Sequence, residues 1–276
     1  MQRGAFVLGA AMFLCLVGCT TFYGAGQLGY DMVPVPPIHL SDEKDASQTE
    51  IHGLFKVTRI NSILYTEDFS WMAQGGFLYI PKTPLLDGGL VIFYPGVLTA
   101  WSGMAFCNHS PSGVPIENLI PGRYMFYGGS FQQGLYLMMP SGTNSYVRSG
   151  IQLQGAYETG PYREFRRTIS RNSPYVIDGS YYYFEDYSSS PWSVTVLLDL
   201  LGYQYSQGDE SFMVTASMAF HWPSVFSVKD LMNDGGFRSA GLTGMYRKDR
   251  ISFFASFRSI AMLNMGLTMG VMYQLH

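Results

Sequence analysis

The stretch AMLNMGLTMGVMYQL, residues 261–275, decides the fold class. Its apolar side chains occupy one parity, its small or polar side chains occupy the other, and Met262 and Met272 are exceptions. The apolar row consists of Ala261, Leu263, Met265, Leu267, Met269, Val271, Tyr273 and Leu275. A period of two residues predicts a β-strand. This strand is longer than a typical strand of a soluble domain, and its apolar row is continuous enough to face lipid.

The composition of the chain fits a membrane β-barrel. Charged residues make up 13% of the chain and aromatic residues 16%, whereas about a quarter of the residues in a soluble domain are charged. Beyond the N-terminal region, no apolar run approaches the roughly 20 residues of a membrane helix. A barrel accounts for both observations, because its strands need apolar side chains only at alternate positions.

The same alternation recurs along the chain. Between residues 146 and 158, apolar side chains fill one parity and polar or charged side chains fill the other. The apolar row is Val147, Ile151, Leu153 and Tyr157, and the polar row is Arg148, Gln152, Gln154 and Glu158. Residues 192–200 and 211–221 repeat the pattern. In a membrane barrel, such apolar rows face lipid and such polar rows face the lumen.

We predict an all-β fold, an antiparallel transmembrane β-barrel of about twelve strands. The predicted strands are 52–65, 71–80, 89–105, 123–139, 145–157, 162–170, 174–184, 192–205, 210–221, 237–246, 250–259 and 261–275. An even number of strands places both chain ends on the periplasmic side, where turns are short. Short turns are expected there near 141–144, 171–173, 206–208 and 247–249, and the long connections 107–122 and 222–236 are expected outside. Because the junction near Ile260 would need a very tight hairpin, ten or fourteen strands also fit the pattern.

The last residues resemble the C-terminal signal that outer-membrane barrels present to their assembly machinery. Gly270, Tyr273 and Leu275 fall at the glycine, aromatic and final hydrophobic positions of that signal, and His276 extends one residue beyond it. The resemblance implies an assembly signal at these three residues. It also implies a location in the outer membrane of a bacterium, with barrel-assembly machinery and outer-membrane lipid as partners.

The first residues resemble the signal of bacterial lipoproteins. Arg3 precedes an apolar run, residues 4–17, that is too short for a comfortable membrane span. The sequence Leu-Val-Gly-Cys at residues 16–19 resembles a lipobox. That resemblance implies cleavage before Cys19 and lipidation of its thiol, and Thr20 in place of an aspartate favours export to the outer membrane. An ordinary signal peptide with an incidental cysteine is the alternative.

These signals divide the chain into three parts. Residues 1–18 are the predicted signal peptide, residues 19–50 a periplasmic linker or a plug that folds into the lumen, and residues 51–276 the barrel. Residues 33–37 are rich in proline, and residues 23–32 could instead form a first strand. After cleavage and lipidation only Cys107 would keep a thiol, so no intramolecular disulfide is expected.

Enzymatic and cofactor sites are not evident in the sequence. The five histidines lack metal-ligand spacing, and paired glycines lack the pattern of a phosphate loop. The run Asn108, His109 and Ser110 invites comparison with a lipid hydrolase, but sequence neighbours point apart in an extended chain. We therefore expect no catalytic residue, no metal, no cofactor and no nucleic-acid partner.

Four arginines, Arg123, Arg148, Arg163 and Arg167, are candidates for contacts with anions in the lumen. Together they could form a basic wall that attracts small anionic solutes, or bind the phosphates of lipopolysaccharide. The alternative is a strand end whose arginines pair with nearby carboxylates. On a strand, Arg163 and Arg167 share one parity.

The predicted function is that of a lipid-anchored outer-membrane barrel without enzymatic activity, either a small channel or an envelope and surface structural protein. One alternative is a soluble periplasmic or surface lipoprotein with a β-sandwich or lipocalin-like fold that binds a ligand or polysaccharide. Another is a membrane-embedded lipid hydrolase. Alternation alone cannot distinguish the inside from the outside, so the direction of the apolar rows decides between the first two.

Overall fold

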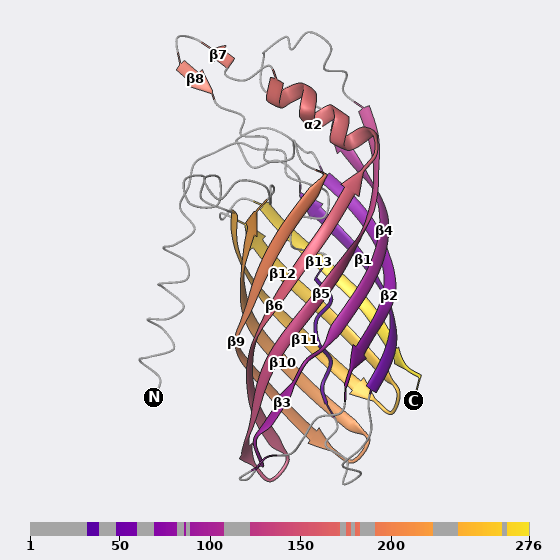
Figure 1. The fold of residues 1–276 in the computed structure, drawn as a ribbon, viewed down its shortest axis with the longest axis vertical. Helices are drawn as coiled ribbons and strands as arrows, with labels where there is room; N and C mark the ends of the chain where they lie inside the picture. Colours follow the sequence, from indigo (N-terminus) through magenta and orange to yellow (C-terminus); the bar gives the residue numbers. More distant parts are fainter. Residues whose placement is uncertain are drawn as a thin grey trace.

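The computed structural model describes residues 32–38, 48–59, 69–81, 86, 89–107, 122–171, 175–177, 180–182, 191–222, 237–260 and 264–275. The strands of the main sheet are β1 (Gln48–Arg59), β2 (Phe69–Ile80), β3 (Val91–Phe93), β4 (Gly96–Cys107), β5 (Gly122–Gly142), β6 (Ser145–Thr159), β9 (Trp192–Gln207), β10 (Glu210–Trp222), β11 (Phe237–Lys248), β12 (Ile251–Ile260) and β13 (Asn264–Gln274). All neighbouring strands pair antiparallel. They form the tall barrel seen in Figure 1.

Ten of these strands close into a ring in the order β5, β4, β2, β1, β13, β12, β11, β10, β9 and β6, and β6 pairs again with β5. The short β3 pairs with the far end of β5, beside the chain that leads into β4. Pro95 separates β3 from β4, because a proline has no N–H to donate to a neighbouring strand. Its carbonyl still accepts a hydrogen bond from Gly134 N at 2.8 Å.

The direction of the side chains follows the alternation in the sequence. Apolar side chains stand on the outside, for example Phe77, which is 57% exposed, and Leu201, which is 58% exposed. The polar row of β6 points inward, and Arg148 is 1% exposed. The predicted direction of the apolar rows is therefore confirmed. The soluble alternative is wrong, because it requires these apolar rows to be buried.

Apolar groups also occupy part of the interior. Met72, Leu78, Val97 and Phe126 are buried on the inner side of β2, β4 and β5. Buried polar side chains occur on these strands too, for example Gln74 and Gln132, but most of them lie on β1, β6 and β9 to β12. The wall formed by β2, β4 and β5 thus contains more of the buried apolar side chains, and the rest of the ring contains more of the buried polar ones.

Two of the twelve predicted strands are wrong. Residues 162–170 lie in helix α2 (Pro161–Arg171). The described residues within 174–184 form the small hairpin of β7 (Tyr175–Ile177) and β8 (Ser180–Tyr182), outside the barrel (Figure 1). Gly160 has a φ of 116° and Pro161 follows it, which favours a helix start. Tyr162 and Phe165 then bury their rings against Phe126 and Tyr124 at the rim, with centroid distances of 5.8 and 4.5 Å.

The two ends of the barrel differ. One, which we call the short-turn end, carries the turns at 143–144, 208–209 and 249–250. There Leu275 N donates to Thr49 O at 2.8 Å, so the first and last strands meet. The other, which we call the loop end, carries α2 and the connections that leave β4 and β10. The inside turn predicted to begin at Arg171 is therefore wrong, because Arg171 ends α2 at the loop end.

Short turns are typical of the periplasmic side of an outer-membrane barrel. The junction predicted near Ile260 lies between β12 and β13, at residues 261–263. Among the described residues, no helix combines the length and the hydropathy needed to cross a bilayer.

Candidate functional site: the lumen and the segment inside it

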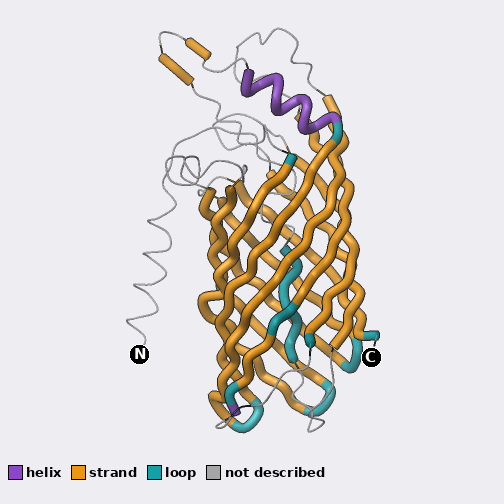
Figure 2. The backbone as a smooth tube through the Cα atoms, viewed as in Figure 1, coloured by secondary structure: helices purple, strands orange, loops and turns teal. Residues whose placement is uncertain are grey.

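A segment of the N-terminal region, residues 32–38, runs through the lumen, where Figure 2 draws it in teal inside the strands. It contains Pro34, Pro36 and Pro37. Prolines favour an extended chain and remove N–H groups that would otherwise need partners in the interior. Val33 and Val35 are fully buried. The segment therefore fills part of the barrel interior rather than lying on its surface.

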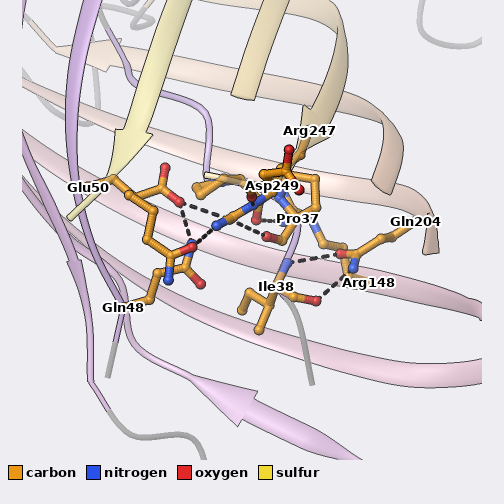
Figure 3. Close-up of polar contacts among 10 residues, drawn as sticks. Pro37, Ile38, Gln48, Glu50, Arg148, Gln204, Arg247 and Asp249 are labelled. Carbon is orange, nitrogen blue, oxygen red and sulfur yellow. Dashed lines mark hydrogen bonds and ion pairs between the residues drawn. The ribbon is translucent and has the colours of Figure 1, made fainter. Parts of the chain in front are cut away.

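Side chains from three strands hold the main chain of this segment, and we call them the clamp: Arg148 on β6, Gln204 on β9 and Arg247 on β11. Arg148 donates through Nη2 to Val35 O at 2.8 Å and through Nη1 to Pro36 O at 3.2 Å. Arg247 Nη1 donates to Pro37 O at 3.2 Å. Figure 3 shows these side chains converging on the segment.

Gln204 completes the clamp with two hydrogen bonds to one residue. Its Nε2 donates to Ile38 O at 2.8 Å, and Ile38 N donates to its Oε1 at 3.3 Å (Figure 3). Four consecutive carbonyls, those of residues 35–38, thereby receive donors from the wall. The contacts satisfy the main chain of a buried segment that has no strand partner. They recognise an extended backbone and not particular side chains.

Arg247 also belongs to a buried ion pair. Its Nη1 lies 2.9 Å from Glu50 Oε1 on β1, and each side chain is 1% exposed. Gln48 donates to the same carboxylate oxygen, and Arg247 Nη2 donates to Gln274 on β13. One guanidinium thus links β11, β1, β13 and the segment. A buried charge of this kind depends on its partners, because taking it out of water is costly.

Arg148 is oriented by an aromatic ring. Its Cζ lies 5.2 Å from the centroid of the Tyr136 ring, and that ring stacks on Phe93 with centroids 5.0 Å apart. Tyr136 donates its hydroxyl to Asp199 Oδ2 at 2.5 Å, and Gln152 donates to the Tyr136 hydroxyl at 2.5 Å. These contacts fix the ring beneath the guanidinium and place a carboxylate close to it.

Two glycines make room for these large side chains. A Cβ at Gly150 would collide with the Tyr136 ring, and a Cβ at Gly202 would lie 2.7 Å from Arg148 Cγ. Both glycines occupy inward-facing positions on β6 and β9, where a side chain would otherwise fill the lumen. The close approach of Tyr136 and Arg148 to the wall therefore depends on the absence of side chains at these two positions.

A second polar cluster lies farther from the short-turn end. His221 on β10 is hydrogen-bonded through Nδ1 to Thr195 Oγ1 at 2.9 Å and through Nε2 to Ser239 Oγ at 3.3 Å. Arg258 on β12 donates to Ser239 Oγ at 3.4 Å and to Ser217 Oγ at 3.0 Å. No carboxylate takes part in these hydrogen bonds, so the cluster is not a Ser-His-Asp arrangement.

A small cavity remains between the segment and the wall. It is lined by Met32, Val33 and Pro34 on one side, and by Arg148 and Arg258 among the wall residues. Its volume of about 20 Å³ is room for roughly one water molecule. The described part of the segment therefore lies close against this part of the wall.

The four arginines singled out in the sequence do not form one wall. Arg148 points into the lumen and bonds the segment. Arg123 is exposed on the outer side of β5, with its Cζ 5.4 Å from the centroid of Phe106. Arg163 and Arg167 lie on α2 and pair with Glu164 at 3.9 and 2.9 Å. The common parity of the last two is lost, because the segment is a helix and not a strand.

The other predicted site residues lie partly outside the described residues. Cys19 is among residues 1–31, and Asn108, His109 and Ser110 follow β4 directly; neither group is described. Gly270 and Tyr273 lie on β13, and Tyr273 is exposed on the outer side, while Leu275 follows the strand. Within the described ranges, no group of three histidine, cysteine or acidic residues could hold a metal ion.

Sequence reasoning missed Gln204, Arg247, Glu50 and Asp199 as lumen residues. A turn was predicted at Arg247, although its side chain continues the inward-facing row of Thr243 and Met245 on β11. Extending each alternating row to the last residue before its turn would have identified Arg247 as a lumen residue. The pairing of these side chains with residues 32–38 had no local signal, because it depends on closure of the ring.

A closed antiparallel ring with an apolar outer surface and buried charged side chains inside defines a transmembrane β-barrel. No protein-family model matches the chain, and no curated protein is significantly similar to it.

Several solved barrels are similar in structure. The beta domain of the Bordetella autotransporter BrkA is 9% identical, with 84% of this chain and 100% of that chain covered and a TM-score of 0.39. The transport unit of the Escherichia coli autotransporter AIDA-I is 8% identical, with 86% and 93% covered and a TM-score of 0.37. The KdgM porin in complex with disordered oligogalacturonate is 7% identical, with 84% and 100% covered and a TM-score of 0.30. These values are too low to transfer any activity to this chain.

Proposed function

We propose that this chain is a lipid-anchored barrel of a bacterial outer membrane, and that it forms a narrow channel closed near its short-turn end by its own residues 32–38. The observation that carries the proposal is the clamp, in which Arg148, Gln204 and Arg247 bond four consecutive carbonyls of the segment. Residues 32–38 belong to none of the paired strands. The segment can therefore leave the lumen while the strands of the ring stay paired. We assign no catalytic role to the chain.

The charge of the interior favours anionic solutes. Apart from the Glu158–Arg166 pair beside α2, the buried charged side chains in the described part of the lumen are four cations, Lys56, Arg148, Arg247 and Arg258, and two carboxylates, Glu50 and Asp199. An excess of cations along a pore attracts anions and repels cations. We therefore propose small anionic solutes as cargo once the segment has moved.

The ends of the chain support the proposed location. The predicted assembly signal, Gly270, Tyr273 and Leu275, falls in and directly after β13, the strand that closes the ring against β1. Barrel-assembly machinery is therefore a proposed partner. Lipidation of Cys19 rests on the lipobox-like sequence alone. Outer-membrane lipid would contact the exposed apolar rows.

Planar-bilayer recording tests the channel. We expect low conductance from the mature full-length chain, and stable, anion-preferring currents from a variant that lacks residues 20–47 and keeps Cys19 joined to β1. A synthetic peptide of residues 32–38 should reduce the currents of the deletion variant. A shift of gel mobility on boiling verifies that both proteins form closed barrels. Equal conductance of the two proteins would overturn the proposal.

A purely structural role is the second candidate. The cavity between the segment and the wall, about 20 Å³, favours it, because a space of that size passes no solute unless the segment leaves. The same recordings separate the two functions. A deletion variant that folds into a closed barrel but carries no current would support the structural role.

A further inference from the structure

We infer that the chain passes through the lumen from the loop end to the short-turn end, so that the residues before Met32, with the lipid proposed on Cys19, lie at the outer surface of the cell. The inference rests on the proposed outer-membrane location and lipidation. Residues 19–50 were expected to form either a periplasmic linker or a plug in the lumen, and the inference differs from the first of these. Its basis is the direction in which residues 32–38 run.

The two ends of the segment lie at different depths. Met32 is buried in a cluster with Leu197 on β9 and Ala219 on β10, two residues that pair with each other in the half of the barrel wall nearer the loop end. Ile38 bonds Gln204, which lies close to the turn at 208–209. The chain therefore runs from the interior toward the short-turn end as the residue number increases. It then reaches β1, which begins at that same end.

The clamp fixes this direction. Arg148 bonds the carbonyls of Val35 and Pro36, Arg247 bonds Pro37, and Gln204 bonds both polar main-chain groups of Ile38. Reversal of the segment would exchange these partners and lose the paired bonds of Gln204. The three prolines also keep residues 34–37 extended, so the segment cannot turn back on itself within this stretch.

The cavity beside the N-terminal half of the segment is too small for a second pass of the chain. The cavity beside Met32, Val33 and Pro34 measures about 20 Å³, which holds roughly one water molecule and is far smaller than an amino-acid residue. An anchor in the periplasmic leaflet would require the preceding residues to pass back beside the segment toward the short-turn end. An anchor at the loop end requires no such return.

The length of chain before Met32 suffices for the outer surface. Twelve residues lie between Cys19 and Met32, and a fully extended chain from one to the other spans up to about 45 Å. From Ala219, β10 continues only to Trp222 before it ends at the loop end, a distance of about 10 Å along the strand. The proposed lipid can therefore reach the outer leaflet from the loop end.

Epitope accessibility on intact cells tests the inference. In one variant, a short hydrophilic epitope is inserted between Tyr23 and Gly24 of the full chain, expressed in a Gram-negative host. Two reference variants carry the same epitope between Asp178 and Gly179, in the β7–β8 hairpin at the loop end, or between Gly208 and Asp209, at the short-turn end. Antibody binding is measured before and after permeabilisation of the outer membrane, and the boiling shift verifies folding.

We expect the epitope after Tyr23 to bind antibody on intact cells, as the 178–179 epitope does, while the 208–209 epitope binds only after permeabilisation. An epitope after Tyr23 that follows the 208–209 variant overturns the inference. If the two reference variants exchange their behaviour, the loop end faces the periplasm, and both the proposed orientation and the inferred outer-surface location are wrong.

A second variant avoids an insertion. Thr21→Cys is treated on intact cells with a membrane-impermeant maleimide, against Glu164→Cys on the exposed face of α2 and Asp209→Cys in the short turn. Cys107 is fully buried in the barrel wall and should stay unlabelled. Labelling of Thr21→Cys together with Glu164→Cys supports the inference, and labelling only together with Asp209→Cys contradicts it.

Discussion

Arg247 and Glu50 form an ion pair of 2.9 Å inside the barrel, and each side chain is 1% exposed. The pair joins β11 to β1 across the two strands that lie between them. Because Arg247 also bonds Pro37 O, the same guanidinium stabilises the wall and holds the segment. Loss of this one side chain should therefore affect both stability and closure.

Arg247→Ala should lower the free energy of unfolding by about 3 kcal/mol, because it leaves a buried carboxylate without its cation. Denaturant unfolding of the barrel in lipid vesicles measures the change. Arg167→Ala is the matched control, because Arg167 pairs with the exposed Glu164 on α2, and its loss should change stability by less than about 1 kcal/mol. Equal effects of the two substitutions would contradict the role given to the buried pair.

Arg148→Gln should loosen the segment without opening the ring. The substitution removes the two donors to Val35 O and Pro36 O, whereas Gln204 and Arg247 keep their bonds. We expect more frequent channel openings in planar bilayers than for the unmodified chain. Arg123→Gln removes the same charge from the outer side of β5, so its opening frequency should match that of the unmodified chain. Identical recordings for both variants would argue against the clamp.

Gly150→Ala should destabilise the barrel by about 1 to 3 kcal/mol, because the added methyl group would collide with the ring of Tyr136. That ring cannot move freely, since it stacks on Phe93 and bonds Asp199. Gly155→Ala, on the same strand, has no atom within 4 Å of the added Cβ. It should leave stability unchanged or raise it slightly. Comparable losses in both variants would show that strand flexibility, and not the fit around Tyr136, determines the effect.

The sequence predicted the barrel strands well because each one alternates between two different solvents. Lipid selects apolar side chains on one parity and the lumen selects polar ones on the other, so a row such as Arg148, Gln152 and Gln154 reveals its strand directly. The strand predicted at residues 162–170 is wrong because Tyr162, Phe165 and Arg166 are buried at helical spacing. Gly160 and Pro161 were the local signals of a helix start.

The clamp could not be predicted in the same way. Parity places Arg148 inside, but it places Gln204 on the lipid side with Leu200, because a β-bulge reverses the parity of β9 between Asp199 and Gly202. Parity also does not say what either side chain bonds. Their partners lie more than a hundred residues away, in the proline-rich segment, and the ring must close before they meet. The roles of Gly150 and Gly202 could not be predicted either, since each depends on a side chain of a neighbouring strand, Tyr136 or Arg148.

Ion selectivity tests the charge of the lumen. In the variant without residues 20–47, Lys56→Gln should reduce the preference for anions, because Lys56 is buried on the inner side of β1. Reversal potentials in a salt gradient measure the preference. Lys248→Gln removes an equal charge at an exposed position beside a short turn, where bulk salt screens it. A larger shift for Lys248→Gln than for Lys56→Gln would contradict the assignment of the lumen charges.

The most direct test of the central claim is the thiol reactivity of Val35→Cys in the folded, full-length barrel. Val35 is 0% exposed between the clamp residues, so its substituted thiol should react with a small methanethiosulfonate reagent at least a hundredfold more slowly than that of Gln207→Cys at the exposed short-turn end. Adding Arg148→Gln should accelerate the buried thiol. Equal rates for Val35→Cys and Gln207→Cys in the otherwise unmodified barrel would show that residues 32–38 do not occupy the lumen.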